Sequence, residues 1–326
     1  MTHNESAKGP QVFRYLKIRT REHLAQRIGV PLPILEEVAR FLDLHYNPTW
    51  VKEKKDGSVR EIDVPKPLLM DIQKQIHVKF LSRLWLPNAI HGYRRKRSIM
   101  TATEMHAGTR HLWIADIRSF YPSISAWHVQ DMFVRLKCTP DVAALLRRLT
   151  TRHHHLPQGA ATSPSLANLY LRTYRVAERI EGAAKQYGLK VSFFGDDILV
   201  SGSRPFSHLY PRFEEIINES GLRLKQSKTI AASSASDSHR ALGIVLNARG
   251  TERDVPRAYR RQLRRLLYIA KRYGLTALRA RSFTEADPRQ FLSGKISFAV
   301  SVNQRNRSYF ELLHGLDRPR ESKGVG

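Results

Sequence analysis

Residues 191–201, VSFFGDDILVS, set two adjacent aspartates between apolar residues, and this stretch decides the fold. The apolar residues on either side predict two short buried strands, and Gly195 suits the first central position of a type II′ turn, where φ is positive. The hairpin holds Asp196 and Asp197 at its tip. Neighbouring carboxylates repel each other, and apolar surroundings raise the cost of ionising both. Mg²⁺ offsets that cost because it prefers oxygen ligands, whereas an ordinary Asp-containing turn is the alternative.

A second apolar run, LWIADI at residues 112–117, also leads into an acid, Asp116. Two strands with acids at their ends can meet at one edge of a sheet and present three carboxylates to two metal ions. Such an ion pair stabilises both the attacking and the leaving oxygen in phosphoryl transfer. Taken alone, Asp116 is equally consistent with an ordinary acid at the end of a strand. The interpretation therefore depends on what accompanies these acids in the sequence.

A third motif, LPQGAATSPSLANL at residues 156–169, lies between them. Its Thr162-Ser163-Pro164 predicts a helix start, with a cap at Thr162 followed by proline in the first turn. Together with DIRSFYPSI at residues 116–124 and FFGDD at residues 193–197, in this order and spacing, it resembles the reverse transcriptase family. The resemblance is greatest to the bacterial retron reverse transcriptases and covers about residues 50–310. It implies an α+β fold of the right-hand polymerase type, with fingers, a ferredoxin-like palm and a helical thumb. It also implies RNA-directed DNA polymerase activity.

The resemblance implies roles for individual residues at the reaction centre. Asp116, Asp196 and Asp197 match the catalytic residues that bind two Mg²⁺ ions, and the backbone carbonyl of Ile117 matches a further ligand. Tyr121 matches the bulky residue that excludes a 2′-hydroxyl on the incoming nucleotide, and core packing is the alternative role.

Further residues match positions near the incoming nucleotide. Gln158 and Gly159 match the segment that packs on the nucleotide and the template base. Arg94 and Arg97, in HGYRRKRSI at residues 91–99, match a fingers segment that holds the triphosphate; a basic loop on the nucleic-acid backbone is the alternative. Lys228 matches a lysine that acts as general acid near the triphosphate, or it is simply solvated.

The composition independently predicts a polyanionic partner. The 326 residues include 55 Lys plus Arg against 29 Asp plus Glu, a formal net charge of +26, which favours nucleic acid. Hydrophobic residues make up 41% of the chain and exclude a disordered protein. The single cysteine, Cys138, excludes an internal disulfide and a Cys-rich zinc site. No apolar run reaches the ~18 residues of a membrane span, and no signal-peptide core is evident, so we expect a cytoplasmic protein without a membrane partner.

The C-terminal region changes in character after residue 254. An apolar stripe at helical spacing predicts a helix over residues 254–272, and cations cover its other faces. This helix resembles a thumb helix that lies along the template–product duplex, where arginines bind phosphates without reading sequence; a solvated charged face is the alternative. The expected nucleic-acid-binding residues are Arg257, Arg260, Arg261, Arg264, Lys271 and Arg272.

These features predict a division into three domains. Residues 1–110 form N-terminal helices and fingers. Pro31 and Pro33 divide two of these helices, and the region includes a hairpin at residues 52–60 around an Asp-Gly turn. Residues 111–250 form the palm, with a fingers insertion near 128–158, and residues 251–326 form the basic helical thumb.

The resemblance implies a retron enzyme that makes msDNA from a structured non-coding RNA. It is primed by a 2′-hydroxyl, consumes deoxynucleoside triphosphates, holds an RNA–DNA duplex and serves anti-phage defence with an effector protein encoded nearby. Two motifs depart from the retron pattern. Residues 102–106, ATEMH, keep only the histidine of Asn-Ala-x-x-His, and residues 241–243, ALG, keep only the glycine of Val-Thr-Gly. Another defence-associated or intron-derived bacterial reverse transcriptase therefore stays open. A catalytically idle RNA-binding protein with this fold is a separate alternative, against which the three intact acids argue.

Overall fold

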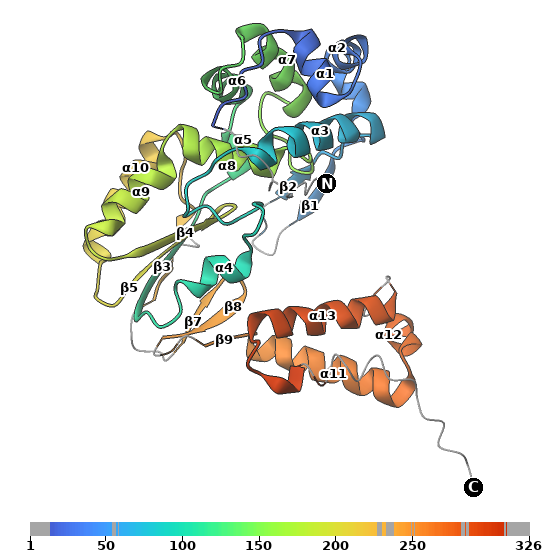
Figure 1. Ribbon diagram of the computed structural model, residues 1–326. Coiled ribbons are helices and arrows are strands. Elements are labelled where there is room, and N and C mark those ends of the chain that lie inside the picture. Colours follow the sequence, from blue (N-terminus) through green and yellow to red (C-terminus); the bar gives the residue numbers. More distant parts are fainter. Residues whose placement is uncertain are drawn as a thin grey trace, which may run out of the picture. The chain divides into compact units, whose positions relative to one another are not determined.

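The computed structural model combines helices and short sheets (Figure 1). The residues it describes are 14–53, 57, 59–226, 230–232, 238–248, 250, 252–281, 284, 287–309 and 311. The chain divides into two compact units. The first contains the described residues up to Ala102 together with residues 113–200 and 206–230, and the second contains residues 103–112, 201–205 and the described residues from 231 onward. The division into fingers, palm and thumb stays a prediction.

Helices form the N-terminal part of the first unit. Helix α1 (Arg21–Ile28) begins where the Thr20 hydroxyl accepts a hydrogen bond from the His23 N–H, and it ends at Gly29 with φ of 79°. Pro31 separates it from α2 (Leu32–Arg40), as the sequence predicts. These helices pack with α3 (Pro67–Lys79), α6 (Ala126–Arg135) and α7 (Pro140–Thr150) around a continuous apolar core.

The two strands of the hairpin predicted over residues 52–60 are confirmed, whereas Asp56 of its predicted turn lies outside the described residues. Strands β1 (Trp50–Glu53) and β2 (Val59–Ile62) pair antiparallel, with Trp50 opposite Ile62 and Glu53 opposite Val59. Most of their side chains are exposed. The hairpin is therefore held by backbone pairing and by its base near residue 63, not by a core of its own.

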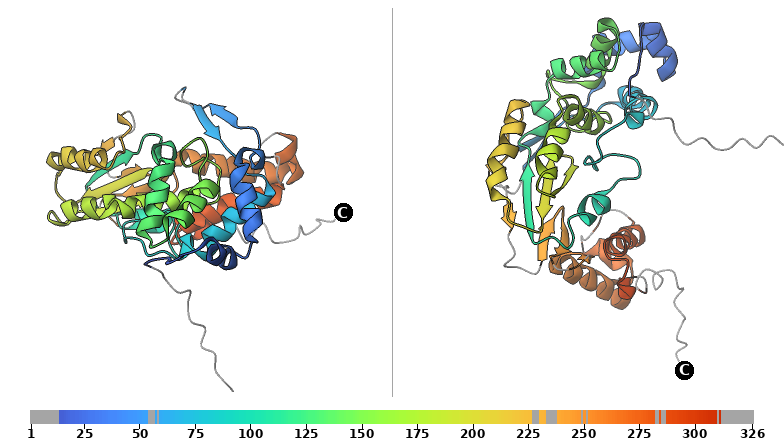
Figure 2. Two further views of the ribbon diagram at one scale, coloured as in Figure 1. Left: turned by 90° about the horizontal axis from the view of Figure 1, so that it is seen from above. Right: turned by 60° about the vertical axis from the view of Figure 1, so that its left-hand side comes forward.

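A four-stranded sheet carries the aspartates. Its strands lie in the order β4-β5-β3-β6, and the hairpin predicted over residues 191–201 forms β4 and β5. Helices α9 and α10 pack on it (Figure 2); the Trp113 ring of β3 lies 5.6 Å from the Tyr210 ring and 5.4 Å from the Phe213 ring. The bounds are β3 (His111–Asp116), β4 (Lys190–Phe194), β5 (Asp197–Gly202), β6 (Ile230–Ala232), α9 (Val176–Lys185) and α10 (Tyr210–Glu219).

Helix α8 (Ser163–Thr173) follows the LPQG motif and is almost entirely buried. Pro164 lies in its first turn, as expected, because proline lacks the N–H that a helix start leaves unpaired. The expected cap by Thr162 does not form: its backbone is helical, and its buried Oγ1 has no hydrogen-bond partner among the described residues. Instead the Ser163 hydroxyl donates a 2.7 Å hydrogen bond to the Pro157 carbonyl.

The second unit contains an antiparallel sheet and a helical region. The sheet order is β7-β8-β9, and α11 packs against α12 and α13. The Tyr259 hydroxyl of α11 donates a 2.9 Å hydrogen bond to the Lys295 carbonyl of α13. The bounds are β7 (Ser238–Ala241), β8 (Ile244–Asn247), β9 (Arg253–Asp254), α11 (Arg257–Tyr273), α12 (Thr276–Ala280) and α13 (Pro288–Val302).

Short helical turns complete the described secondary structure: η1 (Leu42–His45), η2 (Leu81–Arg83), α4 (Ile99–Glu104), α5 (Phe120–Ser123) and η3 (Ser207–Leu209). Among the helices of the described ranges, none has both the length and the apolar character that a membrane crossing requires.

Candidate active site

The two acid-bearing strands are neighbours in the sheet. Strand β3 ends at Asp116 and β5 begins at Asp197. The N–H of Ile117 donates a 2.8 Å hydrogen bond to the Asp196 carbonyl, and the Lys225 N–H donates a 2.8 Å bond to the Asp116 carbonyl. The backbone therefore fixes the end of β3 beside the tip of the β4–β5 hairpin.

The carboxylates differ in exposure. Asp116 is 6% exposed, whereas Asp196 and Asp197 are half-buried. No group of three or more His, Cys, Asp or Glu side chains within the described ranges is arranged to hold a metal ion. Mg²⁺ does not require such a group, because it commonly takes one or two carboxylates and fills its other positions with water and substrate phosphates. The carboxylates and the adjacent backbone carbonyl supply the hard oxygen donors that this ion prefers.

Two glycines at the hairpin turn are required for different reasons, one for its backbone conformation and the other for close approach. Gly195 has φ of 64°, which favours glycine. Gly92 lies against it: a Cβ on Gly92 would be 2.6 Å from the Gly195 nitrogen. Residues 89–92 pair with β4, since the Phe193 N–H donates to the Ala89 carbonyl (2.7 Å) and the His91 N–H donates to the Phe193 carbonyl (2.8 Å). Because of this pairing, the basic loop that follows, residues 93–97, lies next to the β4–β5 hairpin that carries Asp196 and Asp197 (the aspartate hairpin).

Arg94 and Arg97 have different surroundings within that loop. The Arg94 guanidinium donates hydrogen bonds to the carbonyls of Pro87 (2.8 Å) and Ile90 (3.3 Å). Burial lowers the pKa of Arg94 below its ordinary value, and the neighbouring Arg97 lowers it further. Part of the donor capacity of Arg94 is therefore used to shape the loop. Arg94 and Arg97 are both half-buried, and both line one cavity.

Two cavities that share lining residues open beside the basic loop, with volumes of about 430 and 490 Å³. Tyr93, Arg94 and Arg95 line both of them, and Phe194 of the aspartate hairpin lines the second. A concave surface with several cations next to paired carboxylates suits a phosphate-bearing ligand that also carries metal ions.

Tyr121 lies close to the aspartate hairpin. It belongs to α5, directly after β3, and is half-buried. Burial raises its pKa most; Tyr93 raises it further through its charge and a side-chain hydrogen bond, and Asp196 raises it through its charge. Arg60 of β2 acts in the opposite direction. The phenol therefore stays protonated at neutral pH, within electrostatic reach of Asp196 and of Arg60.

Gln158 and Gly159 lie against the base of the β1–β2 hairpin. The Asp63 N–H donates a 2.7 Å hydrogen bond to the Gln158 carbonyl. Gly159 has φ of 118°, and a Cβ there would be 2.6 Å from the Asp63 carbonyl oxygen. Glycine is therefore required at position 159 by both backbone conformation and close approach.

Other functional candidates emerge only from the structure. Arg60 is exposed on β2, opposite Lys52, and is close enough to Tyr121 to influence its pKa. The cluster of basic residues around the predicted hairpin is the feature of the sequence that could have indicated a functional role for Arg60. The partners of the LPQG segment, Asp63 and Gln73, have no comparable signal, because nothing near them in the sequence sets them apart.

The predicted thumb residues lie on one basic helix of the second unit, and Lys228 lies outside the described residues. Helix α11 buries Leu263, Leu266 and Ile269. Five of the six predicted cations are exposed: Arg257, Arg261, Arg264, Lys271 and Arg272. The sixth, Arg260, is half-buried and pairs with Asp254 at 3.1 Å. This pairing gives Arg260 an evident structural role.

Comparisons with known proteins identify the family. Residues 52–246 match the family model described as reverse transcriptase (RNA-dependent DNA polymerase). The retron Se72 reverse transcriptase of Salmonella heidelberg is 27% identical over 80% of this chain and 70% of its own length. The retron Mx162 enzyme of Myxococcus xanthus is 28% identical over 78% of this chain and 60% of its own length. The retron Mx65 enzyme of the same organism is 27% identical over 94% of this chain and 72% of its own length.

Among solved structures, the chain is similar to telomerase from Candida albicans in complex with a fragment of telomeric RNA. The TM-score is 0.46 with 12% sequence identity, over 86% of this chain and 64% of that one. The family match covers more than half of the chain and includes all three motifs that carry the resemblance. The chain belongs to the reverse transcriptase family: it is an RNA-directed DNA polymerase with a right-hand polymerase fold, similar to the retron enzymes of bacteria.

Proposed function

We propose that Asp116, Asp196 and Asp197, with the carbonyl of Ile117, bind two Mg²⁺ ions and form the catalytic centre. The observation that supports this most is the pairing of the two acid-bearing strands, fixed by the hydrogen bond from the Ile117 N–H to the Asp196 carbonyl. When bound, the ions activate the attacking hydroxyl and stabilise the charge that develops on the phosphates. The aspartates hold the reaction centre at the ends of the two central strands of the sheet, and the burial of these strands restricts their movement.

Other residues orient the incoming deoxynucleoside triphosphate in this proposal. Tyr121 contacts the sugar and leaves no room for a 2′-hydroxyl. Gln158 and Gly159 pack on the nucleotide and the template base, and Arg97 contacts the triphosphate. Arg94 shapes the basic loop through its bonds to Pro87 and Ile90 and adds positive charge.

Lys228 is the proposed general acid at the triphosphate. We also propose that residues 1–110 act as fingers, residues 111–250 as the palm with an insertion near 128–158, and residues 251–326 as the thumb. The exposed cations of α11 then contact the phosphates of an RNA–DNA duplex.

A metal-removal experiment tests the catalytic centre. Primer extension on an RNA template is expected to stop in excess EDTA and to resume when Mg²⁺ is added back. Asp116→Asn is expected to abolish the recovery while template–primer binding is retained. Recovery in the Asn variant at the wild-type rate would contradict the assignment.

We further propose that the enzyme is a retron reverse transcriptase that makes msDNA from a structured non-coding RNA. Its similarity to retron enzymes supports this, and the net charge of +26 suits binding of a folded RNA by shape and backbone. A 2′-hydroxyl of the RNA is the proposed primer, so the DNA product stays joined to the RNA. Anti-phage defence in the cytoplasm, together with an effector protein encoded nearby, completes the proposal.

The product distinguishes this proposal from its alternatives. Nucleic acid is extracted from cells that carry the gene with its native flanking DNA, with an Asp197→Asn strain as control, and is treated with RNase. Short single-stranded DNA with a branched RNA remnant, removable by a debranching enzyme and absent from the control, is expected. Unlinked DNA, or DNA joined to protein, would assign the enzyme to another defence-associated or intron-derived group of bacterial reverse transcriptases. No DNA in either strain, together with RNA bound to the purified protein, would indicate an idle RNA-binding protein.

A further inference from the structure

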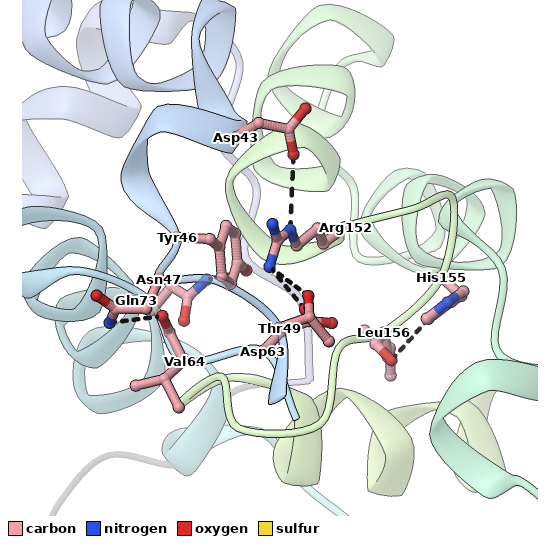
Figure 3. Close-up of polar contacts among 10 residues, drawn as sticks. All are labelled: Asp43, Tyr46, Asn47, Thr49, Asp63, Val64, Gln73, Arg152, His155 and Leu156. Carbon is pink, nitrogen blue, oxygen red and sulfur yellow. Dashed lines mark hydrogen bonds and ion pairs between the residues drawn. The ribbon is translucent and has the colours of Figure 1, made fainter. Parts of the chain in front are cut away.

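The segment between α7 and α8, residues 151–162, contains Gln158 and Gly159 and has little regular structure of its own. Its position is set by residues far away in the sequence, at the base of the β1–β2 hairpin and on α3 (Figure 3). A loop held by few local hydrogen bonds needs such external contacts to keep one conformation. Asp63, Arg152 and Gln73 supply these contacts.

Asp63 contacts the segment through both its side chain and its backbone. Its carboxylate Oδ1 accepts hydrogen bonds from the Thr49 hydroxyl (2.6 Å) and from Nη1 of Arg152 (2.6 Å). Its N–H donates to the Gln158 carbonyl at 2.7 Å, and its own carbonyl packs directly on Gly159. One residue therefore connects Arg152, at the start of the segment, to the two residues proposed to contact the nucleotide.

Arg152 is nearly enclosed by its partners. The side chain is 10% exposed, and that of Asp63 is 3% exposed. The guanidinium lies 4.4 Å from the centre of the Tyr46 ring, and Nε lies 3.5 Å from Oδ1 of the exposed Asp43 (Figure 3). Asp63 is thus the only buried acid that the structure pairs with Arg152 among the described residues. Loss of its charge would leave a largely desolvated cation with one exposed partner.

Gln73 of α3 holds the two ends of the segment together. This fully buried side chain donates from Nε2 to the Leu149 carbonyl (3.0 Å) and to the Tyr46 hydroxyl (3.3 Å). Its Oε1 accepts a 3.3 Å hydrogen bond from the Ala161 N–H. The end of α7 and the residue two positions after Gly159 are therefore joined through one amide group.

We infer that the Asp63–Arg152 ion pair is a positioning device for nucleotide recognition: it holds Gln158 and Gly159 where the incoming nucleotide and template base are bound. The inference rests on the proposed role of Gln158 and Gly159. Neither charged group needs to touch substrate, so both are positioning residues. A buried ion pair adds little net stability compared with apolar packing, and its evident contribution is a single defined geometry. The contacts of Asp63 with Arg152, Gln158 and Gly159 all lie on the same segment.

Single-nucleotide insertion on an RNA template–primer tests this inference. The variants are Asp63→Asn, which keeps the shape and an acceptor oxygen, Arg152→Gln, and the double variant. Arg21→Gln is the matched control, because Arg21 also joins separate helices through acids, Glu36 at 2.8 Å and Asp141 at 2.7 Å, but lies away from the segment. The measured quantities are KM and kcat for the nucleotide, the Kd of the template–primer and the melting temperature.

We expect each single variant to raise the nucleotide KM at least fivefold and to raise misinsertion, with the template–primer Kd unchanged. The double variant is expected to be no worse than the poorer single variant, because both remove the same interaction. Arg21→Gln is expected to lower the melting temperature with KM unchanged. Arg152→Lys keeps the positive charge but not the planar fork, so its KM is expected to fall between those of wild type and Arg152→Gln.

Two results would overturn the inference. The first is a nucleotide KM at the wild-type level in folded Asp63→Asn. The second, if Asp63→Asn does not fold, is a KM at the wild-type level in Arg152→Gln. A wild-type enzyme that inserts no nucleotide would overturn the proposed function itself, whereas a normal wild type with unchanged variants would overturn only the role of the ion pair.

Discussion

The N–H of Ile117 donates a 2.8 Å hydrogen bond to the carbonyl of Asp196. This bond joins the residue after β3 to the tip of the β4–β5 hairpin, so the chain segments that carry Asp116 and Asp197 cannot separate without breaking backbone pairing. A reaction centre built on adjacent strands is more rigid than one built on loops, and rigidity favours preorganised electrostatic stabilisation. The proposed catalytic residues therefore depend on the sheet as well as on their own charges.

Tyr121 is predicted to discriminate between deoxyribonucleotides and ribonucleotides. Tyr121→Ala removes the ring and is expected to raise the ribonucleotide-to-deoxyribonucleotide ratio of kcat/KM by about tenfold or more, which corresponds to ~1.4 kcal/mol. Tyr121→Phe is the matched control, because it keeps the ring and should keep the discrimination. Steady-state insertion with both nucleotide types measures the ratio. An unchanged ratio in an active Ala variant would show that the ring serves only in packing.

Helix α11 is predicted to bind nucleic acid through phosphates. Replacing Arg257, Arg261 and Arg264 by Gln should weaken binding to unrelated RNA–DNA duplexes about equally. The slope of log Kd against log salt should become shallower, by up to about 0.9 per lost contact on B-form DNA and by less on RNA. These side chains are exposed, so the fold should be retained.

A charge-matched triple variant serves as control for the effect of net charge. Arg40, Arg135 and Arg212 are exposed on helices α2, α6 and α10, and their replacement by Gln should leave the salt slope near the wild-type value. Equal slopes for the two triple variants would remove the support for a duplex-binding role of α11.

His91 is predicted to make stability depend on acidity. Burial, and then the charges of Arg97 and Arg94, lower its pKa from 6.5 to about 4. Nε2 is buried without a hydrogen-bond partner among the described residues, so a proton there has no acceptor. Below pH 6.5 the unfolded state binds this proton and the folded state does not. The stability linked to His91 is therefore complete above pH 6.5 and is lost as the pH falls towards 4, by up to about 1.4 kcal/mol per pH unit.

Urea unfolding between pH 7.5 and 5 measures this effect. His77 and His128 also have lowered pKa values through burial, but they are present in both wild type and His91→Gln. The difference between the two proteins therefore isolates His91, and the variant should lose less stability on acidification. Parallel curves for the two proteins would contradict the prediction.

Local patterns predicted much of the fold because the determining residues are close together in the sequence. The β4–β5 hairpin follows from apolar runs around Gly195, and the break between α1 and α2 follows from Pro31. Helix α11 follows from apolar spacing within one segment. Local patterning also led to one incorrect expectation, the Thr162 cap, because the Thr162 backbone is already helical and its side chain accepts no hydrogen bond from the helix N–H groups.

The contacts around the site could not be predicted in the same way. Asp63 and Arg152 are 89 positions apart, and neither stands out by type or spacing. The close approach of Gly92 to Gly195 likewise joins two distant turns, and a glycine alone does not reveal what lies against it. The hydrogen bonds of Arg94 to Pro87 and Ile90 could not be predicted for a different reason. A run of basic residues predicts a nearby anion, but it does not predict which of those residues forms hydrogen bonds to the backbone of its own loop.

Extension of a DNA primer on an RNA template by the Asp197→Asn variant tests directly whether Asp116, Asp196 and Asp197 form the catalytic centre. The substitution keeps the shape of the side chain and removes its charge, so the melting temperature and template–primer Kd should match those of wild type. We expect the extension rate to fall by at least about three orders of magnitude, or ~4 kcal/mol of transition-state stabilisation. A folded Asn variant that extends primers at nearly the wild-type rate would contradict the assignment of the catalytic centre.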